Sequence, residues 1–140
     1  MGEFGAERAQ YGIGLRALSV HAQRSGQQIL GHRAGFLRKQ PRIAQRHADW
    51  VVVTSDNPRS ERPADILHQI LLGTIAGETV RAEPDRAAAI GLALQEADAR
   101  DVVLIAGKGH EDYQETAGVR QPFSDMAQAI AALQRRGGTP

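Results

Sequence analysis

Two short apolar runs constrain the fold of this chain more than any other feature. They are Trp50-Val51-Val52-Val53-Thr54 and Val102-Val103-Leu104-Ile105, and segments with helical periodicity flank both. A continuous apolar run between helices is typical of a parallel strand that is covered on both faces, so we expect 102–105 to be the most buried strand. The alternation predicts an α/β fold with a mostly parallel sheet and flanking helices.

Start and stop signals place helices between these runs. Pro63 suits the first turn of a helix and Gly73 suits its end, while Asp85 and Ser124 are favoured N-capping residues. We therefore expect a helix end at 43–48, a helix between Pro63 and Gly73, a short strand at 79–82, helices capped by Asp85 and Ser124, and a loop or hairpin at 113–121.

The composition fits one small domain. The 140 residues are 41% hydrophobic, which is enough to bury a single core. Cysteine is absent, which excludes a disulfide framework, and the five histidines lack the spacing of metal ligands. Without an apolar run of about 20 residues or a signal peptide at the start, we expect a cytoplasmic protein with no membrane partner.

Charge divides the chain into two parts. Residues 1–50 hold eight Arg and Lys against three acidic residues, whereas the rest carries an acidic excess. We expect residues 1–41 to be a poorly specified basic segment and residues 42–140 to be the folded domain. A basic arm can contact nucleic acid, which salt-dependent DNA binding would test. It lacks interleaved aromatics and a reading motif, so we do not expect that partner.

Polar and glycine-rich residues follow both apolar runs directly. Ser55-Asp56-Asn57-Pro58-Arg59 comes after the first run and Ala106-Gly107-Lys108-Gly109-His110-Glu111 after the second. In open α/β sheets, ligands bind beyond the carboxyl ends of the parallel strands. A guanidinium grips a carboxylate, and carboxylates and carbonyls receive an ammonium group, so this set suits a zwitterionic ligand.

Each of these residues also has a simpler interpretation. Asp56-Asn57-Pro58-Arg59 could form only a turn. Lys108 does not belong to a phosphate-binding loop, because the G-x-x-x-x-G-K-[ST] spacing is absent, so we expect it to be a surface or ligand-edge cation. His110 fits a hydrogen-bonded loop residue better than a general base. Arg86 could cap or salt-bridge within its helix, or line the cleft.

Four motifs together resemble the C-terminal domain of the Mur ligase family. They are the segments 50–61 (WVVVTSDNPRSE), 85–90 (DRAAAI), 106–114 (AGKGHEDYQ) and 123–125 (FSD). Four motifs in order at natural spacing form a more specific match than a lone glycine pattern. The resemblance implies the Rossmann-like fold of that domain.

The resemblance implies an ATP-dependent amide ligase of peptidoglycan precursor synthesis. In this family ATP phosphorylates the D-glutamate carboxylate of UDP-N-acetylmuramoyl-L-alanyl-D-glutamate, and the amine of an incoming amino acid attacks the acyl phosphate. The C-terminal domain holds that amino acid. ATP and Mg²⁺ are the implied cofactors of the full-length enzyme, and we do not expect either to bind fully to this chain.

Asp56-Asn57-Pro58-Arg59 matches the motif version that the family associates with meso-diaminopimelate. Members that add L-lysine carry a different residue at the arginine position. Diaminopimelate has a second amino-acid head, so Arg59 can supply a cation for its extra carboxylate. Glu111 and the backbone around Gly107 can receive the ammonium group of that head. The implied substrate site comprises Asp56, Asn57, Arg59, Gly107 and Glu111, with no catalytic residue and no metal ligand.

Residues 19–41 depart from the family pattern. Leu15-Arg16-Ala17-Leu18 with His21 resembles the segment that leads into the domain, after which a strand and a Gly-Asp-Arg-Asp loop should follow. The chain has Gly31-His32-Arg33-Ala34-Gly35-Phe36-Leu37-Arg38-Lys39 instead, in which Arg33 is a candidate for the loop arginine that contacts the amino acid. We therefore expect the first strand and loop to be degraded or missing, and we hypothesise a shifted reading frame or local degeneration.

The chain has no counterpart of the family's ATP-binding domain or of its uridine-nucleotide domain. We expect a truncated form, or one that works with separate partners, which binds the amino acid and cannot turn over alone. It would meet the UDP-muramoyl dipeptide only together with the missing domains. The alternative is a stand-alone diaminopimelate or muropeptide binding module without catalysis, which useful affinity for the free ligand would distinguish.

Overall fold

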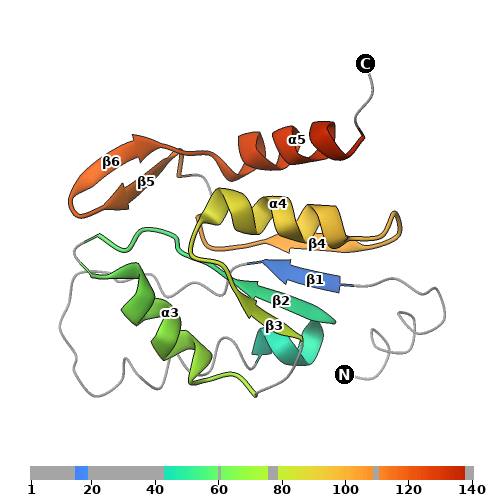
Figure 1. Ribbon diagram of the computed structural model, residues 1–140, viewed down its shortest axis with the longest axis horizontal. Coiled ribbons are helices and arrows are strands. Elements are labelled where there is room, and N and C mark those ends of the chain that lie inside the picture. The colour runs from blue at the N-terminus through green and yellow to red at the C-terminus, as the bar shows by residue number, and fades with distance from the viewer. Residues whose placement is uncertain (1–14, 19–42, 60, 76–78, 109–110, 138–140) are drawn as a thin grey trace.

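The main sheet of the computed structural model is parallel and has the order β3-β2-β1-β4. The structure describes residues 15–18, 43–59, 61–75, 79–108 and 111–137. Figure 1 shows helices packed against the sheet and a separate antiparallel hairpin, which confirms the expected α/β class. The elements are β1 (Leu15–Leu18), β2 (Trp50–Val53), α3 (Pro63–Leu71), β3 (Val80–Ala82), α4 (Arg86–Glu96), β4 (Val102–Ile105), β5 (Tyr113–Thr116), β6 (Val119–Pro122) and α5 (Asp125–Arg136).

Strand β1 lies in the middle of this sheet. Its Ala17 pairs with Val51 of β2 on one side and with Leu104 of β4 on the other. The segment that we expected to lead into the domain thus forms a central strand itself. Pairing between strands uses only main-chain N–H and C=O groups. The four residues of β1 can therefore fill the place between β2 and β4, whatever the sequence of the chain after them. The strand and loop that we expected to be degraded or missing after this segment, including Arg33, lie outside the described residues.

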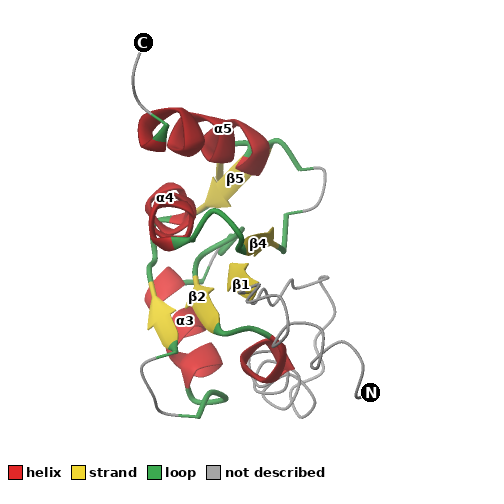
Figure 2. Ribbon diagram, turned by 90° about the vertical axis from the view of Figure 1, so that its right-hand side faces the viewer, coloured by secondary structure: helices red, strands yellow, loops and turns green. Residues whose placement is uncertain are grey.

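Strand β2 divides the core into two layers. Val52 packs with Ile90 and Leu94 of α4 on one face, whereas Val51 and Val53 pack on the opposite face, against α3. Successive side chains of a strand point to opposite faces, so this three-valine run is buried on both. Figure 2 shows the strands between these helices, with α5 lying against α4.

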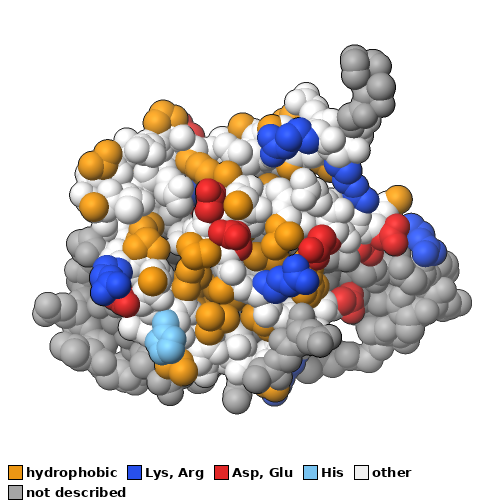
Figure 3. Space-filling view, viewed as in Figure 1, with side chains coloured by type: hydrophobic (Ala, Val, Ile, Leu, Met, Phe, Trp, Pro, Cys, Tyr) orange, Lys and Arg blue, Asp and Glu red, His pale blue; other side chains and the backbone are white. Residues whose placement is uncertain are grey.

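Strand β4 differs from the sequence-based expectation. It was expected to be the most buried strand, but Val102 is 54% exposed and Leu104 is 52% exposed. The physical reason is its position, because β4 forms one edge of the described sheet. Only its alternate residues Val103 and Ile105 pack into the α4 layer. Figure 3 shows that hydrophobic side chains also reach the surface on one face of the molecule.

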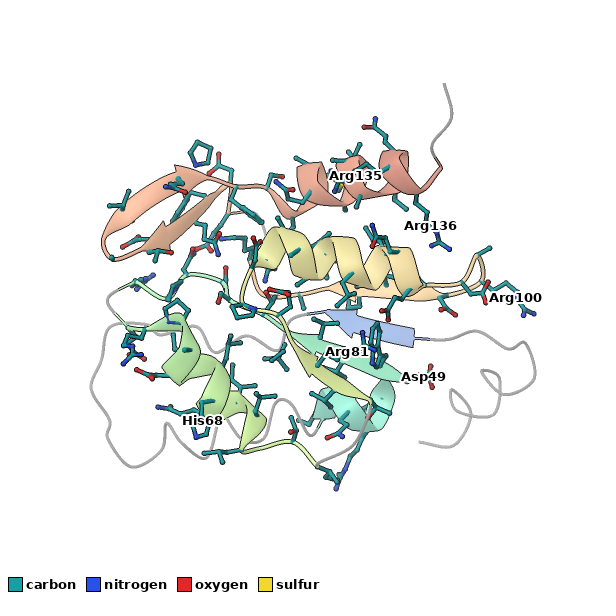
Figure 4. The ribbon with its side chains drawn as sticks, viewed as in Figure 1. Asp49, His68, Arg81, Arg100, Arg135 and Arg136 are labelled. Carbon is teal, nitrogen blue, oxygen red and sulfur yellow. The ribbon has the colours of Figure 1, made fainter. Side chains whose placement is uncertain are left out.

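The helix signals in the sequence are confirmed. The Asp85 side chain accepts hydrogen bonds from the backbone N–H groups at the start of α4, Ser124 caps α5 in the same way, and Pro63 lies in the first turn of α3. At the other end of α5, Arg136 donates to the carbonyl of Leu94 in α4 at 2.7 Å (Figure 4). None of the helices in the described ranges has the length and apolar character that a bilayer span requires.

Candidate functional site

The loops after β2 and β4 meet at the carboxyl ends of their strands, next to the hairpin β5–β6. The Nδ2 of Asn57 in the first loop donates to Oε2 of Glu111 in the second at 2.9 Å, across 54 residues of sequence. Parallel strands bring the loops that follow them to one edge of the sheet, as the sequence predicts. Of the expected substrate residues, Asp56, Asn57, Arg59, Gly107 and Glu111 all lie on these two loops.

A buried ion pair joins the two loops beneath the surface. The Nζ of Lys108 lies 3.1 Å from Oδ1 of Asp56, and both side chains are 0% exposed. Of the two expected alternatives, a surface cation is wrong, whereas a cation at the ligand edge stays a prediction. A buried charge requires a partner, and Asp56 is the partner of Lys108. The sequence pattern alone could not show that these two side chains pair. Asp56 thus lies below the site and is held by the second loop.

Asn57 is bonded at both ends of its amide. Its Oδ1 accepts from the backbone N–H of Glu115 at 2.9 Å and from Nζ of Lys108 at 3.2 Å. Its Nδ2 donates to Glu111, as described above. Asn57 therefore connects the first loop, the second loop and the hairpin.

Arg59 is held through its backbone, and its side chain is exposed. Its φ of 54° lies in the left-handed region, which costs a residue with a Cβ on the order of 1 kcal/mol. Two hydrogen bonds to the hairpin stabilise this conformation: the N–H of Arg59 donates to the carbonyl of Glu115 at 3.2 Å, and the N–H of Ala117 donates to the carbonyl of Arg59 at 2.6 Å.

The second loop begins at a glycine that the backbone requires. Gly107 has a φ of 118°, which side-chain-bearing residues rarely adopt, and it follows Ala106 directly after β4. The N–H of Glu111 then donates to the carbonyl of Lys108 at 3.1 Å, which closes the loop. Gly109 and His110 lie outside the described residues, so the prediction for His110 stays a prediction.

Arg86 at the start of α4 lies behind both loops. It is 1% exposed, its Nε and Nη2 bind the Asp125 carboxylate of α5 at 2.7 and 2.6 Å, and its other donors reach the carbonyls of Ser55 and Ala106. The sequence left open whether Arg86 salt-bridges within its own helix or lines the cleft; the structure shows a salt bridge to another helix. No local pattern in the sequence signals this contact, because it joins residues that are 39 positions apart.

Charged side chains continue onto the hairpin. Arg120 donates to Oε2 of Glu115 at 2.9 Å, and its guanidinium carbon lies 4.5 Å from the centroid of the Tyr113 ring. The hydrogen bond to Glu115, followed by the electrostatic effects of Tyr113 and Glu115, raises the pKa of Arg120 above its ordinary value. Within the described residues, no three His, Asp or Glu side chains come together in a way that could hold a metal ion.

Comparison with known proteins gives a consistent result. Residues 22–109 match the family model described as Mur ligase, glutamate ligase domain. The UDP-N-acetylmuramoyl-L-alanyl-D-glutamate–2,6-diaminopimelate ligase of Acidovorax sp. (strain JS42) is 76% identical over 96 residues, which cover 69% of this chain and 19% of that protein. The ligase of the same name from Chromobacterium violaceum is 52% identical over 98 residues, which cover 70% of this chain and 20% of that protein.

The fold has a solved counterpart with the same name. A structure of UDP-N-acetylmuramoyl-L-alanyl-D-glutamate–2,6-diaminopimelate ligase matches with a TM-score of 0.76 and 34% identity, covering 90% of this chain and 25% of that chain. The chain thus spans about a fifth of the length of the two curated relatives named above. Both the sequence and the fold show that this chain belongs to the Mur ligase family.

Proposed function

We propose that this chain is the amino-acid-binding domain of a ligase that adds meso-diaminopimelate to UDP-N-acetylmuramoyl-L-alanyl-D-glutamate in peptidoglycan synthesis. The observation that carries the proposal is the 2.9 Å hydrogen bond from Asn57 to Glu111, because it joins the two loops that hold the candidate ligand-binding groups. The names of the relatives, which are 2,6-diaminopimelate ligases, support the choice of amino acid.

Each residue of the proposed site has a chemical task. The exposed Arg59 guanidinium binds the carboxylate of the distal head of diaminopimelate, a group that lysine lacks. Glu111 and the backbone at Gly107 receive the ammonium group of that head. Asn57 holds Glu111 by its hydrogen bond, and the buried Asp56 supports the site from below through Lys108. A role for Arg33 remains a prediction.

The selectivity for diaminopimelate tests this assignment. In isothermal titration calorimetry with the 140-residue chain, we expect meso-diaminopimelate to bind more tightly than L-lysine. Arg59→Ala should weaken diaminopimelate binding by about 1–3 kcal/mol, roughly 5- to 160-fold, and leave lysine binding nearly unchanged. This loss of binding free energy is smaller than the loss expected for a buried ion pair, because Arg59 is exposed before the ligand binds.

Arg62→Ala is the matched control, since Arg62 is also exposed and lies just before α3. Equal losses for Arg59→Ala and Arg62→Ala would argue for a nonspecific charge effect and against the assigned site. A dissociation constant for free diaminopimelate in the low micromolar range would favour the stand-alone binding module over a ligase domain.

We further propose that ligation needs parts that these 140 residues do not contain. The sequence has no G-x-x-x-x-G-K-[ST] pattern, and the site described above offers no phosphate-binding loop. The chain mixed with ATP, Mg²⁺, the UDP-muramoyl dipeptide and meso-diaminopimelate should therefore release no ADP beyond a protein-free blank. Release of ADP together with the tripeptide product would contradict this part.

The cytoplasmic location expected from the sequence belongs to the same proposal.

A further inference from the structure

Lys108 is a buried amine whose three acceptors come from two segments of the chain, the loop after β2 and the start of β5. Its Nζ lies 3.1 Å from Oδ1 of Asp56, donates to Oδ1 of Asn57 at 3.2 Å and donates to the carbonyl of Tyr113. The centroids of the Tyr113 and Phe123 rings each lie 5.8 Å from this nitrogen, and the side chain is 0% exposed. An ammonium group has three donors, so these contacts use its full capacity.

The contact with Asn57 has a consequence for Glu111. An asparagine amide can be turned so that its oxygen and nitrogen exchange places, and its neighbours decide which orientation is stable. Lys108 and the N–H of Glu115 both present donors to one end of Asn57 and thereby select oxygen at that end. The NH₂ group must then face the carboxylate of Glu111, which accepts its hydrogen bond at 2.9 Å.

The opposite orientation would place the NH₂ group of Asn57 against two donors and its oxygen against a carboxylate. Each of these contacts would be repulsive, in a part-buried setting where unsatisfied polar groups are costly. Lys108 thus acts on Glu111 through Asn57, with no contact to the carboxylate required.

We propose that Lys108 is a positioning residue that fixes the amide of Asn57, and through it the Glu111 carboxylate, in the orientation that receives the ammonium group of the amino acid. The orientation of Asn57 stands on the contacts alone; the consequence for the ligand rests on the proposed function. Neither part requires Lys108 to touch the substrate.

The side-chain amide signals of Asn57 in a ligand-free ¹H–¹⁵N spectrum test the orientation, and Asn57→Ala assigns them by their loss. Asp56→Asn/Lys108→Met removes both charges of the buried pair, so neither is left alone in the core. We expect the Asn57 NH₂ protons to exchange with water at least about tenfold faster in this double variant, and their shifts to move toward those of an unfolded chain.

Two variants serve as matched references. Asp56→Asn keeps the Lys108 contacts with Asn57 and Tyr113 and measures how much of the change comes from the loss of the Asp56 charge, so its Asn57 signals should change less than those of the double variant. Ile70→Val loosens the core layer on the α3 side and should retain the wild-type signals. Retention of the wild-type signals in the double variant would overturn the proposal. Equal changes in Ile70→Val would overturn it as well, because the effect would then be general loosening.

Titration with meso-diaminopimelate separates this inference from the proposed function. We expect the wild-type chain to show ligand-induced shifts and the double variant to bind at least about tenfold more weakly. If the wild-type chain shows no binding, the proposed function fails, yet the ligand-free spectra still decide whether Lys108 orients Asn57. If the double variant binds as tightly as Asp56→Asn, the positioning role of Lys108 is refuted.

Discussion

Arg86 shows how one side chain can hold two loops and a helix together. Its forked guanidinium binds both oxygens of Asp125 while it donates to carbonyls at the ends of β2 and β4. A lysine could not make these contacts at once, because its donors radiate from a single nitrogen. The distance between the two loops that carry the proposed site therefore depends on Arg86, which lies behind both of them.

Arg86→Met should lower the free energy of unfolding by about 3–5 kcal/mol, because it leaves the Asp125 carboxylate, only 18% exposed, and two carbonyls without their partner. Urea denaturation measures this loss. Arg81→Met is the matched control: Arg81 pairs with Glu96 at 3.0 Å, but the two side chains are 53% and 37% exposed, so the loss should be about 1 kcal/mol. Similar losses in the two variants would mean that Arg86 contributes no more than a surface ion pair.

The hairpin β5–β6 is the element that fixes the first loop. It contacts that loop through four hydrogen bonds: Gln114 to the carbonyl of Asp56, the N–H of Glu115 to Asn57, the N–H of Arg59 to Glu115, and the N–H of Ala117 to Arg59. Figure 1 shows the hairpin beyond the end of the sheet toward which β1 points. The strained backbone of Arg59 is thus kept in place by a separate, small element.

The turn of this hairpin offers a test. Ala117 and Gly118 have φ values of 53° and 77°, the positive pair that tight hairpin turns require. Gly118→Val should cost about 1–2 kcal/mol locally, so the amide protons of Arg59 and Ala117 should exchange roughly five- to thirtyfold faster. Those of β2 should be unaffected in hydrogen-exchange NMR.

Val119→Thr is the control for that measurement, since Val119 lies next to the turn and is 59% exposed. It should leave all these exchange rates within about twofold of wild type. If Gly118→Val accelerates exchange in β2 equally, the hairpin and the sheet unfold together, and the hairpin is not a separate clamp.

At the scale of the whole molecule, the sequence predicted what depends on local patterns. The caps Asp85 and Ser124, the valine run of β2 and the positions of both loops follow from residue type and spacing. It did not predict the burial of Lys108 or the exposure of Leu104, because these depend on which strand lies at the edge and which loop supplies a partner. Such facts depend on contacts between distant segments, which periodicity does not encode.

The central position of β1 also depends on contacts between distant segments, and it can be tested by mutation. Because β1 pairs with both β2 and β4, a break in it should weaken the whole sheet and not merely one edge. Ala17→Pro removes a backbone donor and widens the strand spacing, so it should lower the free energy of unfolding by about 3 kcal/mol or more.

In the Ala17→Pro variant, the amide protons of both β2 and β4 should exchange faster, while Ala17→Ser, which keeps the backbone N–H, should change them little. If Ala17→Pro leaves the midpoint of urea unfolding unchanged, β1 does not contribute to the stability of the sheet. In that case β2 and β4 must be held in place by the helices.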